Sequence, residues 1–227
     1  MNIRVIGVVF IVVLFALTSG YMSYSMYGGS GLKEVFNSKN IQVIQKTAAG
    51  TVPHEVSIKN NGNDTIMVKK GETLASSISS NMVIAEDKSI GPKTEVTVKA
   101  FSLEPSKRAI AGTKLLPVNT TYDAVTQVIS STDLSNSDST YNAQLQIWEI
   151  MTGGNLNPYT GEPVALVENK NLRWSQFRQD ISKAKSDVMS TFNVNENELG
   201  SLKDKQINSS QSWIDNATNY IKSSLGI

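Results

Sequence analysis

The sequence contains no cysteine, and this absence excludes several kinds of chemistry at once. Without a thiol the chain cannot form disulfides, thiolate metal sites, a thiol nucleophile or a lipobox-type lipid anchor. Histidine is almost as scarce, since His54 is the only one in the sequence. A histidine-rich metal site or a Ser-His-Asp relay therefore has few ways to form. We predict that the protein is not an enzyme and that it carries no cofactor or metal.

The chain also lacks an excess of charge of either sign. Its 21 lysine and arginine residues face 20 aspartate and glutamate residues, which leaves a net charge of +1. A nucleic-acid-binding protein normally carries a basic excess on one face or segment, so we predict no nucleic-acid partner. The hydrophobic fraction of 40% is compatible with a packed core.

Charged residues are missing from most of the N-terminal region. None occurs between Arg4 and Lys33, and this stretch is longer than the roughly 20 apolar residues that span a bilayer as a helix. Since no positive charge directly follows the apolar run, Arg4 predicts that the N-terminus stays inside and the body lies outside. The predicted membrane anchor is centred on Val5, Ile6, Val8, Val9, Phe10, Ile11, Val12, Val13, Leu14 and Phe15.

Residues 1–27 have two interpretations, a signal anchor that is retained and a signal peptide that is cleaved. Tyr21, Tyr24 and Tyr27 recur at helical spacing, as in the aromatic belt at a membrane surface, and favour the anchor. The small residues at 18–20 resemble a signal-peptidase site and favour cleavage. We expect the anchor, which gives a single-pass cell-membrane protein with an extracytoplasmic body. Cleavage would give a secreted protein, and a helix buried in a cytoplasmic domain is the least expected outcome.

The next part of the chain has the composition of a stalk followed by strands. A glycine- and serine-rich run indicates a flexible stalk over 28–40. Residues 41–104 hold short runs rich in valine, isoleucine and threonine, some alternating with polar residues, as in antiparallel strands with one face in water. The Asn-Asn-Gly-Asn-Asp run at 60–64 predicts a hairpin. We expect a small immunoglobulin-like β-sandwich, with strands at 41–47, 52–60, 64–70, 82–86 and 94–103.

Residues 105–227 are predicted to form an α-helical domain. Apolar residues recur at spacings of three and four in its second half, which predicts two helices packed as an antiparallel pair. The fold class is therefore α+β, with an N-terminal membrane helix, a small antiparallel immunoglobulin-like sandwich and a C-terminal α-helical region. The expected helices span 122–129, from a cap within 136–139 to about 151, 174–192 and 199–225, and residues 155–163 form a loop.

Carboxylates are the remaining groups suited to acid–base catalysis. The candidates are Glu149, Glu162, Glu168 and Asp180. Their spacing does not place two of them together, although folding joins such residues in many enzymes. An extracytoplasmic carboxylate-dependent hydrolase is therefore the alternative to a non-enzymatic role. We expect His54 to be an ordinary solvated or hydrogen-bonded strand residue.

Four asparagines stand in the acceptor pattern for N-glycosylation. The pattern has meaning only if the body lies outside the cell and the host glycosylates its surface proteins. The possible glycosylation sites are Asn63, Asn119, Asn208 and Asn216.

Residues 141–148 read Tyr-Asn-Ala-Gln-Leu-Gln-Ile-Trp and follow a predicted strand. Over about residues 96–154 the chain resembles thioester-type surface adhesin domains, which carry a Gln-x-Ala-Ile-Trp helix. In that family a strand cysteine is cross-linked to the helix glutamine, and the thioester captures a host amine. The resemblance implies Gln144 as the glutamine, Ser102 at the cysteine position and Trp148 as the tryptophan. Without a cysteine the thioester cannot form, and an ordinary helix with a buried tryptophan explains the same residues.

The predicted location of the body outside the membrane and the missing catalytic groups together predict a membrane-anchored cell-surface module. Its role would be binding, adhesion or envelope structure, and its partners would be the membrane and an unknown surface ligand or envelope protein. A further alternative is a filament subunit whose apolar N-terminal helix packs in a fibre core rather than in lipid.

Overall fold

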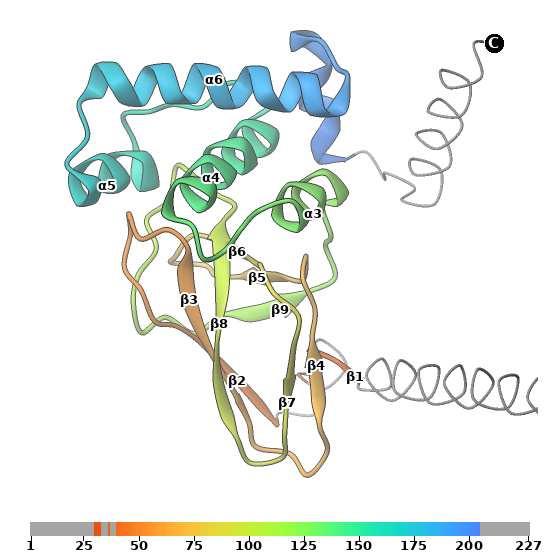
Figure 1. Ribbon diagram of the computed structural model, residues 1–227. Coiled ribbons are helices and arrows are strands. Elements are labelled where there is room, and N and C mark those ends of the chain that lie inside the picture. The colour runs from red at the N-terminus through yellow and green to blue at the C-terminus, as the bar shows by residue number, and fades with distance from the viewer. Residues whose placement is uncertain (1–29, 33–35, 37–39, 205–227) are drawn as a thin grey trace, which may run out of the picture.

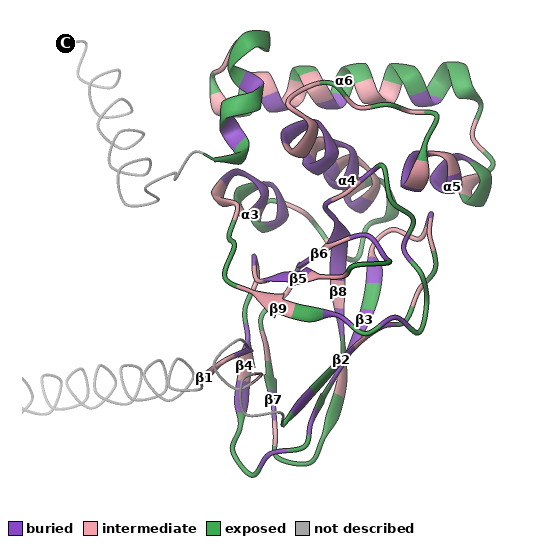
Figure 2. Cartoon of the chain, turned by 180° about the vertical axis from the view of Figure 1, so that it is seen from behind, coloured by how far each residue is buried: buried purple, intermediate pink, exposed green. Residues whose placement is uncertain are grey.

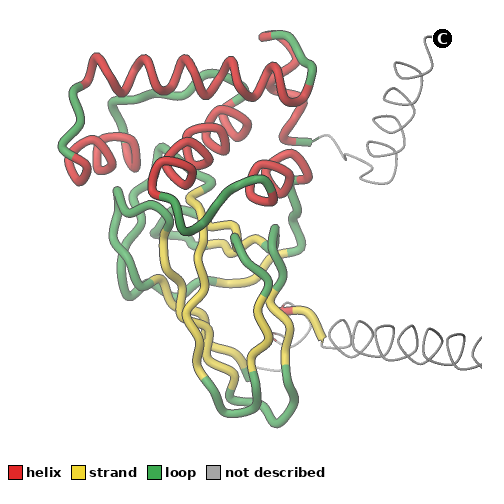
Figure 3. The backbone as a smooth tube through the Cα atoms, in the orientation of Figure 1, coloured by secondary structure: helices red, strands yellow, loops and turns green. Residues whose placement is uncertain are grey.

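The computed structural model describes residues 30–32, 36 and 40–204 (Figure 1). The predicted membrane segment and most of the predicted stalk lie outside these residues, as does the end of the last predicted helix. The described helices gather at one end of the strands, as Figure 3 shows. None of them is long and apolar enough to cross a membrane.

The strands form two sheets. The larger sheet has six antiparallel strands in the order β2-β3-β8-β6-β5-β9, and the smaller has the order β1-β4-β7 with β1 parallel to β4. The strand bounds are β1 Ser30–Gly31, β2 Ile41–Gln45, β3 His54–Asn60, β4 Ile66–Val68, β5 Thr73–Ala75, β6 Met82–Ile84, β7 Lys88–Ile90, β8 Glu95–Ser102 and β9 Leu116–Val118.

The six-stranded sheet curls until its two ends nearly meet. The N–H of Gln45 in β2 donates to the carbonyl of Thr113 at 2.9 Å, and the N–H of Leu115 donates to the carbonyl of Val43 at 3.0 Å. The segment that leads into β9 is therefore bonded to β2, and the sheet is close to a barrel. The predicted fold class is wrong on this point, because one sheet closes on itself instead of two sheets facing each other. Its N-terminal membrane helix finds no support among the described residues.

The hairpin predicted at 60–64 is also wrong. The strands on its two sides belong to different sheets, since β3 pairs with β2 and β8 whereas β4 pairs with β1 and β7. The side chain of Asn60 fixes this crossover by donating to the carbonyls of Asp64, Ile90 and Gly91 at 2.8 to 3.3 Å. The residues at 60–64 do change the direction of the chain, but the two strands that they connect are not paired with each other.

The helices confirm three of the four predicted segments. They are α3 Asp123–Ser130, α4 Ser137–Thr152, α5 Gly161–Lys170, α6 Trp174–Phe192 and the 3-10 helix η1 Glu196–Lys203. Helix α5 was not predicted, because Gly161 and Pro163 resemble a loop, although proline is tolerated in the first turn of a helix. The described part of the predicted helix 199–225 is the end of η1, and the remainder lies outside the described residues.

Buried residues occur in both the strands and the helices (Figure 2), and they form three hydrophobic clusters: one inside the barrel, one between the sheet and the helices, and one among α4, α5 and α6. Successive side chains of a strand point to opposite faces, so Ala100 of β8 faces the barrel interior while Phe101 faces the helices. Leu32, just after β1, is fully buried in the barrel core. Helices α3, α4, α6 and η1 pack over Phe101 and its neighbours. The sheet and the helices therefore share a hydrophobic layer.

Gly50 approaches α5 so closely that only glycine fits. Its φ is +80°, and a Cβ atom there would lie 2.2 Å from the carbonyl oxygen of Ala165. Gly112 has a similar φ of +83°, but no described atom lies within 4 Å of its Cβ position. The two glycines thus share the same backbone requirement and differ in the space around them.

We predict that Gly50→Ala destabilises the protein more than Gly112→Ala does. The second change should cost about 1–2 kcal/mol for the left-handed backbone alone. The first should cost about 2–3 kcal/mol more, because its methyl group overpacks against α5. Urea-induced unfolding of both variants measures the difference, and equal losses would show that α5 does not depend on this close approach.

Candidate functional site

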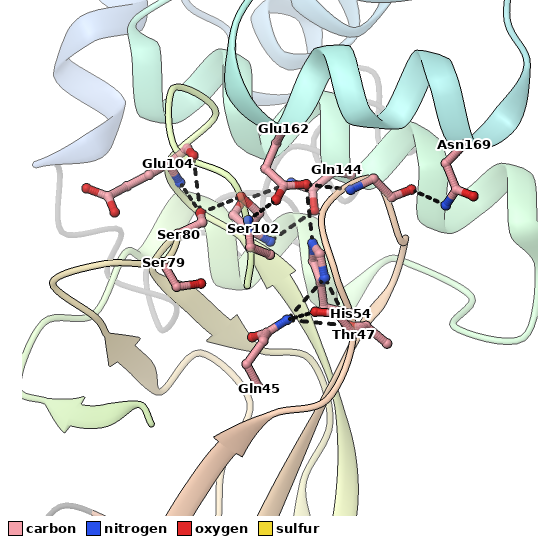
Figure 4. A network of polar contacts seen from close by, with 12 residues as sticks. Gln45, Thr47, His54, Ser79, Ser80, Ser102, Glu104, Gln144, Glu162 and Asn169 are labelled. Atoms are coloured by element: carbon pink, nitrogen blue, oxygen red, sulfur yellow. Dashed lines mark hydrogen bonds and ion pairs between the residues drawn. The ribbon is translucent and has the colours of Figure 1, made fainter. Parts of the chain in front are cut away.

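The end of strand β8 meets helix α4 at Ser102 and Gln144 (Figure 4). The N–H of Ser102 donates to Oε1 of Gln144 at 3.0 Å, and Nε2 of Gln144 donates to the carbonyl of Ser102 at 2.8 Å. Both side chains are fully buried. The amide therefore satisfies the backbone of Ser102 as a neighbouring strand would, and it fixes α4 to the sheet.

The hydroxyl of Ser102 has its own buried partners. Its Oγ lies 2.8 Å from Oγ of Ser80 and 3.4 Å from Nε1 of Trp148. Ser80 also donates to the carbonyl of Glu104 at 3.1 Å. The structure thus brings together the three positions of the adhesin-like motif, Ser102, Gln144 and Trp148. Gln144 and Trp148 both bond to Ser102, whose hydroxyl also contacts Ser80.

A second set of polar groups surrounds His54 in β3, which is fully buried rather than solvated. Its Nδ1 lies 3.1 Å from Oγ1 of Thr47 and 3.3 Å from Nε2 of Gln45. Its Nε2 lies 3.6 Å from Oε2 of Glu162, within range of an ion pair but too far for a hydrogen bond. Nε2 has no hydrogen-bond partner in the described part of the chain.

Glu162, in the first turn of α5, is the most connected of these groups. It is fully buried, and its carboxylate accepts hydrogen bonds from the N–H groups of Gly50, at 2.9 Å, and Ala109. Burial alone would raise the pKa of Glu162, but His54 and the two backbone N–H groups outweigh it and lower that pKa below its ordinary value. The carboxylate is therefore charged at neutral pH and ties two loops and β3 to α5.

We refer to Ser80, Ser102, Gln144, His54 and Glu162 as the buried polar cluster. All five side chains have no exposed surface, so a substrate cannot reach them in this conformation. Among the residues that the structure describes, no three His, Cys, Asp or Glu side chains gather to hold a metal ion. What the cluster does chemically is satisfy backbone groups and join sheet, loops and helices.

The four candidate carboxylates lie in different surroundings. Glu162 belongs to the buried polar cluster, and Glu168 is exposed and lies 3.8 Å from Arg108. Asp180 accepts hydrogen bonds from the hydroxyl of Tyr141 at 2.9 Å and the amide of Gln176. Glu149, the fourth candidate, is a buried residue of α4. Each carboxylate thus has its own environment, and the structure does not bring them into a shared set of partners.

Glu149 of α4 is the fourth candidate and is 1% exposed. Its Oε2 has no hydrogen-bond partner within the described ranges. Burial raises the pKa of Glu149 to about 7, against a smaller opposing effect of the positive charge of Lys185. The group therefore changes charge close to neutral pH inside the helical layer.

Of the possible glycosylation sites, Asn63 and Asn119 are exposed. Asn208, Asn216 and the ten anchor residues lie outside the described residues. Sequence reasoning missed the contact of His54 with Glu162, because these residues are far apart in the chain. Because helix α5 itself was not predicted, nothing in the sequence indicated that Glu162 in its first turn is buried.

We predict that Glu162→Gln lowers the free energy of unfolding by about 3 kcal/mol, since it removes a buried charge that two N–H groups and His54 compensate. Glu168→Gln is the matched control on the same helix. Its carboxylate is exposed and its ion pair is long, so that change should stay within about 0.5 kcal/mol. Chemical denaturation at pH 7 compares the two variants. Equal effects would mean that the buried carboxylate does not hold the fold together.

A second prediction concerns the pH dependence of stability. A carboxyl whose pKa rises from 4.5 to about 7 on folding binds its proton more tightly in the folded state. This group therefore makes stability fall as pH rises from about 4.5 to about 7, by about 3 kcal/mol in total. Glu149→Gln should remove that part of the decline. Unfolding free energies measured at several pH values test this, and an unchanged slope in the variant would contradict it.

The comparisons with known proteins add no relative to this picture. The chain matches no protein-family model, and no curated protein and no solved structure matches it either. The resemblance to thioester-type adhesin domains therefore stays a prediction. Any functional argument for this chain depends on its own residues and their geometry.

Proposed function

We propose that this protein is exported and that its folded body is a non-enzymatic binding or structural module on the outer side of the cell membrane. One observation carries the second half of the proposal. The side chains best suited to chemistry, in the buried polar cluster, are fully buried and are hydrogen-bonded to other parts of the protein. The buried side chains therefore stabilise the fold, and we expect ligands or partners to bind at the surface.

The proposal for export comes from the sequence. The uncharged stretch behind Arg4 has the length and composition of an export signal. The absence of cysteine means that an exported body of this kind is stabilised by burial and hydrogen bonds alone. The closed sheet and its buried polar cluster supply that kind of stability. The resemblance to surface adhesin domains supports adhesion as the broad role.

The surface offers rigid aromatic contacts for such a role. Tyr159 and Trp174 are 56% and 36% exposed, and their ring centroids lie 5.1 Å apart. Arg178 donates from Nη1 to the hydroxyl of Tyr159 at 2.9 Å. Tyrosine, tryptophan and arginine are the residues most enriched in binding hot spots. A binding role therefore has candidate contact residues at the start of α6 and in the loop before α5.

Protease treatment of intact cells, with the full-length protein purified in detergent beside it, tests the proposal. We expect the protease to digest the body on intact cells, and we expect no hydrolysis of peptide, glycan or ester substrates above background. Protection of the body until cells are lysed would contradict export. Hydrolysis that disappears in Glu149→Gln or Glu162→Gln, while circular dichroism shows that the variant is folded, would instead support the carboxylate-dependent hydrolase.

A further inference from the structure

A surface pocket of about 280 Å³ lies where the end of β8 meets the end of α4 and the loop that leads to α5. Its apolar part comes from Leu103, Pro105 and Met151, of which the first two are buried. Its size is at the lower end of the range for small-molecule sites. Such a pocket accepts a ligand about the size of one sugar ring or a short side chain.

Some of the polar groups of the pocket are free to bind a ligand, whereas Thr152 donates to the carbonyl of Trp148 and Asn155 to that of Gly153. The hydroxyls of Ser106 and Thr160 line it, and they make no hydrogen bond with the described residues. Asn157 also lines it, and its Oδ1 accepts from the N–H of Tyr159 at 3.0 Å, which leaves the amide nitrogen available and the side chain oriented. Hydroxyls donate and accept, and an amide nitrogen supplies two donors.

The charged residues of the pocket balance each other. Glu104 accepts from the N–H of Asn81 at 3.1 Å and from Lys107 at 3.2 Å, and Lys203, which also lines the pocket, is exposed. One acid and one base give no preference for an anion or a cation. The pocket therefore suits a neutral ligand with many hydroxyl groups better than a phosphate or a metal ion.

The loop that forms part of the pocket also carries Tyr159, whose partner in the exposed aromatic pair is Trp174 at the start of α6. Tyr159 stands between two lining residues, Asn157 and Thr160, and its ring is tilted by 39° to that of Trp174. The bond from Arg178 and the contact with Trp174 hold the tyrosine in place. Neither aromatic residue lines the pocket itself, but Tyr159 adjoins Thr160 in the chain, and its flat ring offers an apolar face to a neighbouring unit of the same ligand.

From these contacts we infer that the pocket and the Tyr159–Trp174 pair form a saccharide-binding site. A sugar has hydroxyls around its edge and C–H groups on its faces, which matches hydroxyl and amide side chains around an apolar base. The terminal sugar occupies the pocket, and the next one packs on Tyr159. This inference deepens the proposed function, because it names the ligand class of the surface module.

The test uses the full-length protein in detergent, with glucose, galactose, N-acetylglucosamine and their linear trisaccharides as probes. Saturation-transfer NMR and titration calorimetry measure binding. We expect at least one trisaccharide to bind and Asn157→Ala to weaken it by about tenfold, the effect of one lost hydrogen bond. Tyr159→Ala should weaken the trisaccharide but leave the monosaccharide unchanged. Asn63→Ala, an exposed asparagine in the crossover after β3, is the matched control and should have no effect.

Three results would overturn the inference: no binding of any probe at millimolar concentration, binding that both variants leave intact, or a peptide that binds with the same sensitivity to the variants. Circular dichroism of each variant shows whether it is folded. The inference and the proposed function fail separately. A protein exposed on cells that binds no sugar removes only the inference, whereas a bound sugar that is hydrolysed removes the non-enzymatic role.

Discussion

The carboxylate of Glu162 is the group on which the arrangement of this protein depends. A buried charge is tolerated only when fixed dipoles or charges replace the water that it loses, and here the N–H groups of Gly50 and Ala109 and the ring of His54 do so. Helix α5 holds Gly50 from both sides, since Asn169 donates to its carbonyl at 2.8 Å. Ala49 donates to the carbonyl of Ala109 at 3.0 Å. The two loops that contain Gly50 and Ala109 are thus bonded to each other and to helix α5.

The hydrogen bonds between Gln144 and Ser102 likewise satisfy buried polar groups, in this case the peptide groups at the end of a strand. Strand β8 runs beneath the helices, where water cannot satisfy its last peptide groups, and the glutamine amide takes the place of a neighbouring strand. Residues that suggest chemistry when read in isolation, a serine, a histidine and a glutamate, are therefore used to make a polar connection between sheet and helices. The fold needs these groups where they are, so their burial follows from the architecture.

The sequence predicted the elements better than their arrangement. Strands with alternating side chains and helices with apolar stripes were found, and Asn136 does cap α4 by accepting from the N–H groups of Asp138 and Ser139. The closure of the sheet was missed, because the bonds from 113–115 to β2 leave no periodic pattern. Helix α5 was missed because its first turn holds glycine and proline. Ser102 and Gln144 were placed together only through a family resemblance, and His54 with Glu162 not at all.

The buried network also determines how well the surface is organised. The loop that carries Asn157 and Tyr159 begins after Gly153, the left-handed C-cap of α4, and ends at Gly161 beside Glu162. The N–H of Glu162 donates to the carbonyl of Pro105 at 2.9 Å, so the end of the loop is fixed to the segment after β8 that also lines the pocket. A ligand that binds between two segments already held in place loses less free energy in ordering them. The buried carboxylate of Glu162 therefore helps to position the exposed side chains of the proposed surface site.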